Sequence, residues 1–231
     1  MFFRIAVLVL VWGHLETGEG RSITDGDKKQ VTCNKQIDLG ITLDASASIG
    51  EENFKKYKRF SKELLSRFAI SPSRTHVALS YFSMYHHIVA TFNKSHTLEE
   101  ANSIIDDMVY ENSASKLSNA IVELHFAVFA GKCSGVRPKG SGSKMVSLFV
   151  TDGFSTSGYE LTNSRAKDFH NYGIEAFAVY PNGKVHENIL RSIASRPIAK
   201  HLFRLEEKQE KRRSLIDKIV RQICFGSYSK K

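Results

Sequence analysis

From residue 37 onward, short runs of apolar residues alternate with longer segments in which apolar residues recur every three or four positions. The short runs are typical of buried strands, and the longer spacing is typical of helices that pack one face on a core. The segment 51–68 shows the helical spacing, with apolar side chains at Phe54, Tyr57, Phe60, Leu64, Leu65 and Phe68. This alternation predicts a mostly parallel sheet with helices on both faces.

The pattern predicts six strands, at residues 37–43, 76–82, 86–92, 144–151, 174–180 and 199–205. It predicts six helices, at residues 51–68, 98–108, 117–129, 159–172, 186–194 and 206–224, and a flexible surface loop at 131–143. Three residues separate the second and third strands. Because parallel neighbours need a longer crossover, we expect an antiparallel hairpin there. The predicted fold is a doubly wound, Rossmann-like α/β domain whose mostly parallel six-stranded sheet has one antiparallel edge strand.

The N-terminus has the pattern of a secretion signal. Arg4 precedes an apolar run of eight residues, Ile5 to Trp12, and small residues follow at Gly18 and Gly20. Such a run is too short to cross a bilayer, whose hydrocarbon core is about 30 Å thick. No later stretch is long and apolar enough to span a membrane. We therefore expect residues 1–20 to be a signal peptide and the mature protein to be secreted and extracellular.

Three cysteines in an oxidising compartment suggest one disulfide and one remaining thiol. Cys33 precedes the first predicted strand and Cys224 lies near the end of the last predicted helix, so a bond between them would join the two ends of the domain. Cys133 would then be either buried and inert or a link to another chain, which would make a homo-oligomer. Asn93 opens an Asn-x-Ser sequence and is a candidate glycosylation site.

The formal net charge of +9 favours acidic partners. A secreted protein is not expected to bind nucleic acid. The excess positive charge is either a solvated helix face or a patch that binds sulfated glycans or acidic matrix polymers. Much of that excess lies near the C-terminus, at Lys208, Lys211, Arg212, Arg213, Lys218 and Arg221.

Asp44-Ala45-Ser46-Ala47-Ser48 follows the first predicted strand, and its three oxygen-bearing side chains alternate along the loop. Such spacing can turn all three toward one point, and hydroxyls with few carboxylates suit a hard cation such as Mg²⁺. Ser48 ahead of Glu51 also matches the capping box that begins many helices. The loop alone leaves both interpretations open.

Asp152 follows the most apolar predicted strand. In open parallel sheets, ligands bind beyond the carboxyl ends of the strands, so Asp44 and Asp152 are expected at the same rim. A structural role for Asp152 in capping the next segment is the alternative.

The combination of Asp44-x-Ser46-x-Ser48 after an apolar strand with Thr151-Asp152-Gly153 downstream resembles the von Willebrand factor type A domain, also called the integrin I domain. The resemblance covers residues 33–224 and leaves a short basic tail at 225–231. It implies a metal-ion-dependent adhesion site in which the serines bind Mg²⁺, or Mn²⁺ or Ca²⁺, and the carboxylates bind directly or through water. An acidic residue of the ligand would complete the coordination shell.

The resemblance also implies a third loop that supplies a threonine five residues ahead of a small-apolar pair. Counting back from Ala120 assigns this role to Ser115, which keeps the hydroxyl. The glycine pair usual in the family is replaced by residues 111–114, and Ser113 is a competing candidate.

An enzyme is not expected. The Gly153–Gly158 segment misses the G-x-S-x-G spacing of a serine hydrolase by one residue, and no histidine spacing typical of zinc is present. The six histidines considered are expected to be structural or on the surface: His86, His87, His96, His125, His170 and His201.

The expected function is a secreted adhesion or matrix-binding module that binds an acidic extracellular protein or matrix ligand through its metal. The alternative is a structural component of an extracellular or mineral-associated matrix that binds acidic polymers through its basic surface, without metal.

Overall fold

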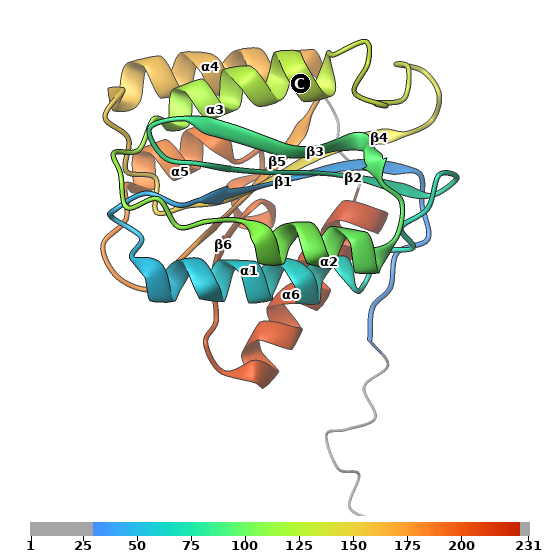
Figure 1. The fold of residues 1–231 in the computed structure, drawn as a ribbon, viewed down its shortest axis with the longest axis horizontal. Helices are drawn as coiled ribbons and strands as arrows, with labels where there is room; N and C mark the ends of the chain where they lie inside the picture. The colour runs from blue at the N-terminus through green and yellow to red at the C-terminus, as the bar shows by residue number, and fades with distance from the viewer. Residues whose placement is uncertain (1–29, 227–231) are drawn as a thin grey trace, which may run out of the picture.

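The structure is a computed structural model that describes residues 30–226, and its centre is a sheet covered by helices on both faces (Figure 1). The sheet order is β3-β2-β1-β4-β5-β6, and only β3 runs antiparallel to its neighbour. The predicted fold class is therefore confirmed. The strands are β1 Ile37–Asp44, β2 Thr75–Phe82, β3 His86–Ser95, β4 Lys144–Val150, β5 Glu175–Tyr180 and β6 Leu202–Arg204.

Helices from separate parts of the chain cover each face of the sheet (Figure 1). One face carries α1 Glu51–Leu65, α2 Leu98–Asp107 and α6 Gln209–Phe225. The other carries α3 Leu117–Glu123 with its π-helical continuation η2 Leu124–Phe129, then α4 Gly158–Tyr172 and α5 Glu187–Ile193. A short 3₁₀ turn, η3 Ile198–Lys200, leads into β6.

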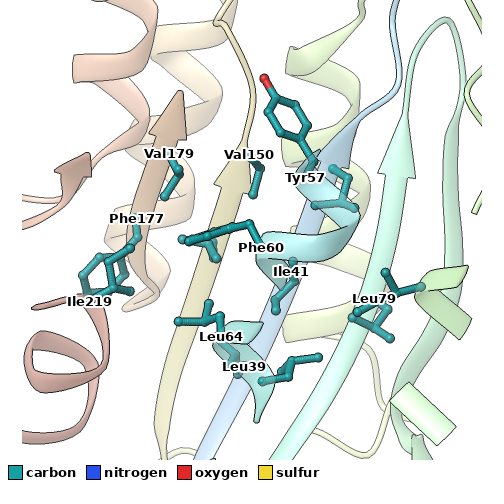
Figure 2. Close-up of a cluster of buried hydrophobic side chains, with 14 of the residues drawn as sticks. Leu39, Ile41, Tyr57, Phe60, Leu64, Leu79, Val150, Phe177, Val179 and Ile219 are labelled. Carbon is teal, nitrogen blue, oxygen red and sulfur yellow. The ribbon is translucent and has the colours of Figure 1, made fainter. Parts of the chain in front are cut away.

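The core under α1 follows from the alternation of side chains in β1 (Figure 2). Leu39 and Ile41 point to the α1 face, where they pack with Tyr57, Phe60 and Leu64. All six apolar positions predicted for the first helix are buried. On the opposite face of β1, Gly40 leaves room for the Phe129 ring, since a Cβ there would lie 3.1 Å from it. The strand thus packs tightly on both sides.

Several element boundaries differ from the predicted ones, and the end of the first helix differs because of contacts distant in sequence. The first helix ends at Leu65 rather than Phe68, since Arg67 O accepts from Cys33 N at 2.7 Å and Ala69 N donates to Cys33 O at 2.9 Å. The predicted helix 117–129 changes to π-helical hydrogen bonding at Leu124. The predicted strand 199–205 shortens to β6, and the last helix begins at Gln209 instead of residue 206.

The last helix ends at Phe225, which the prediction placed in the basic tail. The predicted signal peptide and residues 227–231 of that tail lie outside the described residues. Among residues 30–226, every helix is too short or too polar to cross a membrane.

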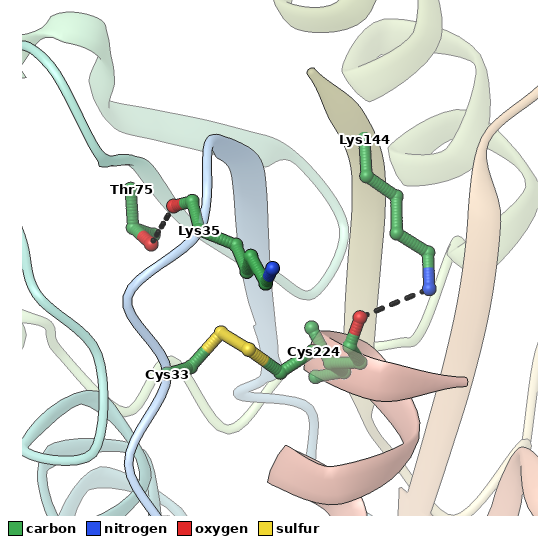
Figure 3. Close-up of a disulfide and its surroundings, with 6 residues drawn as sticks. Cys33, Lys35, Thr75, Lys144 and Cys224 are labelled. Carbon is green, nitrogen blue, oxygen red and sulfur yellow. Dashed lines mark hydrogen bonds between the residues drawn. A yellow bond between two sulfur atoms is a disulfide. The ribbon is translucent and has the colours of Figure 1, made fainter. Parts of the chain in front are cut away.

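The predicted disulfide between Cys33 and Cys224 is present (Figure 3). It closes a sequence separation of 191 residues and ties the segment before β1 to the end of α6. Beside it, Lys144 Nζ donates to Ile223 O at 3.0 Å, which holds the C-terminal turn of α6 against β4. Cys133 is exposed and unpaired within the described chain, so the buried alternative for it is wrong.

Replacing both Cys33 and Cys224 by serine should lower the free energy of unfolding by about 2–5 kcal/mol, because the unfolded chain loses the constraint of a long closed loop. Urea denaturation followed by circular dichroism measures the change. Cys133→Ser is the matched control and should leave the midpoint unchanged. An unchanged midpoint in the double variant would contradict a stabilising role for the disulfide.

Candidate metal centre

Three loops meet at the carboxyl edge of the sheet. Asp44 is the last residue of β1, and Asp152 lies two residues beyond the end of the neighbouring β4. The third loop joins them through backbone hydrogen bonds, from Ala47 N to Ser113 O at 2.8 Å and from Thr156 N to Ser115 O at 2.9 Å. The sheet and these bonds bring together the residues that the sequence pattern singled out.

Both oxygens of the Asp44 carboxylate are held by neighbouring hydroxyls. Oδ1 accepts from Ser46 Oγ at 2.6 Å and from Ser46 N at 3.0 Å, while Oδ2 accepts from Thr151 Oγ1 at 2.6 Å. Asp44 is fully buried. The orientation of the Asp44 carboxylate is therefore fixed by the loop that follows β1 and by the loop that follows β4.

Ser48 does not cap the following helix. The N-cap of α1 is Gly50, which has φ of 74° and leaves the helix start without a side-chain hydrogen bond. The capping interpretation of Ser48 is therefore wrong. The hydroxyl of Ser48 lies 3.3 Å from Ser46 Oγ and hydrogen-bonds the Asp152 carboxylate. It thus belongs to the same group of oxygens as both aspartates.

Asp152 is buried and organises its own loop. Its Oδ1 accepts from Phe154 N at 2.9 Å. The next helix, α4, begins only at Gly158 with Ser157 as its N-cap, so Asp152 does not cap a helix.

Burial, and next to it the nearby charge of Asp152, raise the pKa of Asp44 to about 7, against the hydrogen bonds from Ser46 and Thr151 that lower it. Burial also raises the pKa of Asp152. Two carboxylates in one desolvated place disfavour each other's charged form. A cation between them would reverse that effect, since opposite charge nearby stabilises the ionised state.

Ser115 provides an independent sign that this site suits a ligand. It is buried, and its Oγ atom has no hydrogen-bond partner anywhere in residues 30–226. Leaving a buried hydroxyl unpaired costs about 1–3 kcal/mol. Ser113 is only half-buried, and its backbone carbonyl is the group that binds the Asp44 loop. Ser115 therefore fits the role of third hydroxyl ligand better than Ser113.

A cleft of about 260 Å³ opens at the hydroxyl residues Ser46, Ser48 and Ser115. Phe154 and His186 form an aromatic pair in its wall, with ring centroids 4.5 Å apart. The other lining residues are small or carry hydroxyls: Ser46, Ala47, Ser48, Ser113, Ala114, Ser115, Ser155 and Thr156. Oxygen donors of this kind suit a hard divalent cation, and the cleft leaves space for a group from outside.

Tyr57 and Thr151 contribute to the site in ways that the sequence patterns did not reveal. The hydroxyl of Tyr57 is buried without a hydrogen-bond partner in the described chain, and burial, Asp44 and Asp152 all raise its pKa. In the sequence, the position of Tyr57 indicates only that it belongs to the apolar face of α1. Thr151 was visible in the Thr-Asp-Gly segment, but its hydrogen bond to Asp44 spans 107 residues.

A comparison with protein families matches residues 38–220 to the von Willebrand factor type A domain. The chain belongs to this family. Mouse (Mus musculus) matrilin-2 is 32% identical over 171 residues, which is 74% of this chain and 17% of that protein. Human (Homo sapiens) matrilin-1 is 30% identical over 190 residues, covering 80% of this chain and 37% of matrilin-1. The chain therefore spans well under half the length of either relative.

Among solved structures, proximal thread matrix protein 1 from the mussel byssus has a similar fold, with a TM-score of 0.72 at 21% sequence identity. The match covers 84% of this chain and 48% of the mussel protein. A further structure of the mussel protein is described as having a zinc-occupied MIDAS motif. At this level of identity, the likeness shows the type A fold.

The predicted basic patch is only partly available to a ligand. Arg212 is paired through two nitrogens with the Glu63 carboxylate, at 2.7 and 2.9 Å, and so contributes to packing of α6 on α1. The prediction that Arg212 belongs to the basic patch is therefore wrong, because Arg212 forms a structural ion pair with Glu63. The other five are exposed: Lys208, Lys211, Arg213, Lys218 and Arg221.

Asn93 is exposed near the end of β3, and its Nδ2 donates to Cys133 O at 3.1 Å. Its glycosylation remains a prediction.

The histidines do not form a metal cluster, since no three His, Cys, Asp or Glu side chains gather suitably within the described ranges.

His86 is unusual among the histidines. Its side chain is fully buried, and neither ring nitrogen makes a hydrogen bond within residues 30–226, although Nδ1 lies 3.5 Å from Glu123 Oε2. Burial, with a contribution from His87, lowers the pKa of His86 to about 4 from 6.5.

Protonation of His86 should destabilise the domain in acid. Because the folded pKa lies below the unfolded one, the unfolded state binds the proton more readily as pH falls from 6.5 toward 4. The loss approaches roughly 3 kcal/mol near pH 4. His86→Phe should remove that part of the pH dependence in denaturation curves, while His96→Gln, on the surface, should keep it. Parallel pH profiles for wild type and His86→Phe would contradict the assignment.

Proposed function

We propose that this chain is a secreted matrix-binding module that binds an acidic group of an extracellular partner through a divalent cation. The ligands of the cation are Asp44, Ser46, Ser48, Ser115 and Asp152. The observation that carries the proposal is the convergence of two buried carboxylates with three hydroxyls, one of them unpaired, beneath an open cleft.

The chemistry is that of binding rather than turnover. A bound cation would supply a centre of positive charge that accepts a carboxylate from outside. The chain supplies neutral hydroxyls as most of its ligands, so the two aspartates do not fully neutralise such a charge. Asp44 is oriented by hydrogen bonds from Ser46 and Thr151. We therefore place the chain among binding proteins and not among enzymes.

The oxygen-only donor set favours Mg²⁺, with Mn²⁺ or Ca²⁺ as substitutes. The zinc-occupied motif in the mussel structure supports metal binding in this fold at the family's site. Similarity to the matrilins and to a thread matrix protein supports an extracellular location and a matrix partner. The partner would carry the acidic residue that completes the metal's coordination.

The metal-independent alternative rests on the five exposed basic residues of the C-terminal patch. Charged surface contacts weaken as ionic strength rises, whereas a metal-bridged contact is lost on chelation. The two functions are therefore separable by one experiment.

Immobilised mature protein should capture matrix partners from extracellular extract in Mg²⁺ and lose them in EDTA. Ser46→Ala should reduce capture at least tenfold, because it removes both a metal ligand and a hydrogen bond that orients Asp44. Ser71→Ala, at a turn away from the site, is the control. Capture that persists in EDTA and disappears at raised salt would instead support the basic surface.

Ser115→Ala should weaken Mg²⁺ and Mn²⁺ binding by about tenfold or more in titration calorimetry, whereas Ser113→Ala should change it little. The reason is that only Ser115 presents a buried hydroxyl without a partner. The reverse order of effects would assign the third loop's ligand to Ser113. A flat titration of the wild-type protein would refute the metal site as a whole.

A further inference from the structure

A second concavity, of about 680 Å³, lies between the outer edge of β6 and α6. It shares no lining residue with the metal cleft. Half-buried Leu202 and Phe203 and the buried Leu215 supply its apolar surface, while the exposed Arg204, Lys211 and Lys218 supply positive charge. We call this concavity the β6 groove.

The edge of β6 presents unpaired backbone groups. His201 O accepts from Ala178 N, and Leu205 N donates to Tyr180 O, so these residues direct their backbone groups toward β5. Because the direction alternates along a strand, Leu202 and Arg204 direct their N–H and C=O groups to the open side. β6 is the last strand in the sheet order, and no strand of the described chain covers this side.

The charge of the groove is largely uncompensated. Its one carboxylate, on Glu206, lies 3.7 Å from Arg204. Lys211 and Lys218 form no ion pair among residues 30–226 and stand two turns apart on α6, about 10 Å along its axis. The groove therefore combines a free strand edge with a row of cations.

From this combination we propose that the β6 groove binds an extended acidic peptide segment, which adds as a further strand to β6 and sets its carboxylates against Lys211 and Lys218. Strand addition at an open sheet edge uses backbone hydrogen bonds for affinity and side-chain pockets for specificity. The site needs no metal, and so it is a second binding site beyond the proposed metal-dependent function.

The free edge is what favours a peptide over a sulfated glycan. A glycan would meet the cations, but it offers no backbone donors and acceptors at the spacing of a strand. Leu202 and Phe203 also give the groove an apolar component that a uniformly charged polymer would leave unused.

The probe is a labelled ten-residue peptide of alternating Glu and Thr, titrated by fluorescence anisotropy into the full chain in EDTA. The double variant Lys211→Glu/Lys218→Glu should weaken binding at least tenfold. Arg213→Glu/Arg221→Glu makes the same charge change at exposed positions of α6 outside the groove and should have a much smaller effect. Equal effects of the two double variants would overturn the proposal in favour of general electrostatic attraction.

Backbone pairing is tested separately from charge. The same peptide with N-methylated backbone amides keeps every carboxylate but cannot donate backbone hydrogen bonds, and it should bind at least tenfold more weakly. Amide hydrogen exchange at Leu202 and Arg204 should slow when the unmodified peptide binds. Equal binding of both peptides, unchanged exchange at these amides, or binding of a heparin oligosaccharide without binding of the peptide would each overturn the proposal. Because EDTA is present throughout, none of these results bears on the metal site.

Discussion

The burial of Asp44 and Asp152 close together is the constraint on which the candidate site depends. Neither charge is matched by a cationic side chain in the ion pairs of the described chain. Hydrogen bonds from Ser46, Thr151 and Phe154 N partly stabilise the carboxylates, but burial still raises both pKa values. An arrangement that is unfavourable for folding alone is common where a ligand supplies the missing interaction. The hydroxyl of Ser115, which is unpaired within the described chain, supports the same conclusion.

The rest of the fold keeps this unfavourable arrangement in place. β1 and β4 are central strands, packed by helices on both faces, so their carboxyl ends cannot separate without disturbing the core. In the bonds that hold it to both of them, the third loop contributes backbone carbonyls, which accept from Ala47 N and from the N–H and hydroxyl of Thr156. Its side chains can therefore depart from the family pattern while Ser115 stays in position. At the other end of the sheet, the disulfide and Lys144 fix the last helix.

Local sequence pattern predicted the elements, though not all of their boundaries, and placed both aspartates at the carboxyl edge of the sheet, since strand period and helical spacing are short-range features. Local pattern could not predict the roles of residues whose contacts lie far away in the sequence. The choice between capping and site roles for Ser48 depended on the backbone at Gly50 and on Asp152, and the choice between Ser113 and Ser115 depended on burial. The sequence predicts Arg212 to be a surface charge, because its partner Glu63 lies 149 residues away along the chain.

The metal cleft and the β6 groove differ in the source of the positive charge that an acidic ligand would contact. In the proposed function, the metal cleft offers oxygen ligands and little positive charge of its own, so an acidic ligand would be attracted there only after a cation had bound. The β6 groove carries its cations permanently, on side chains that need no cofactor. Because the two share no residue, one partner with separated acidic segments could engage both, and linkage would raise the effective concentration at the second site. A single domain would then gain avidity without oligomerising, which makes an intermolecular bond through Cys133 unnecessary for tight attachment.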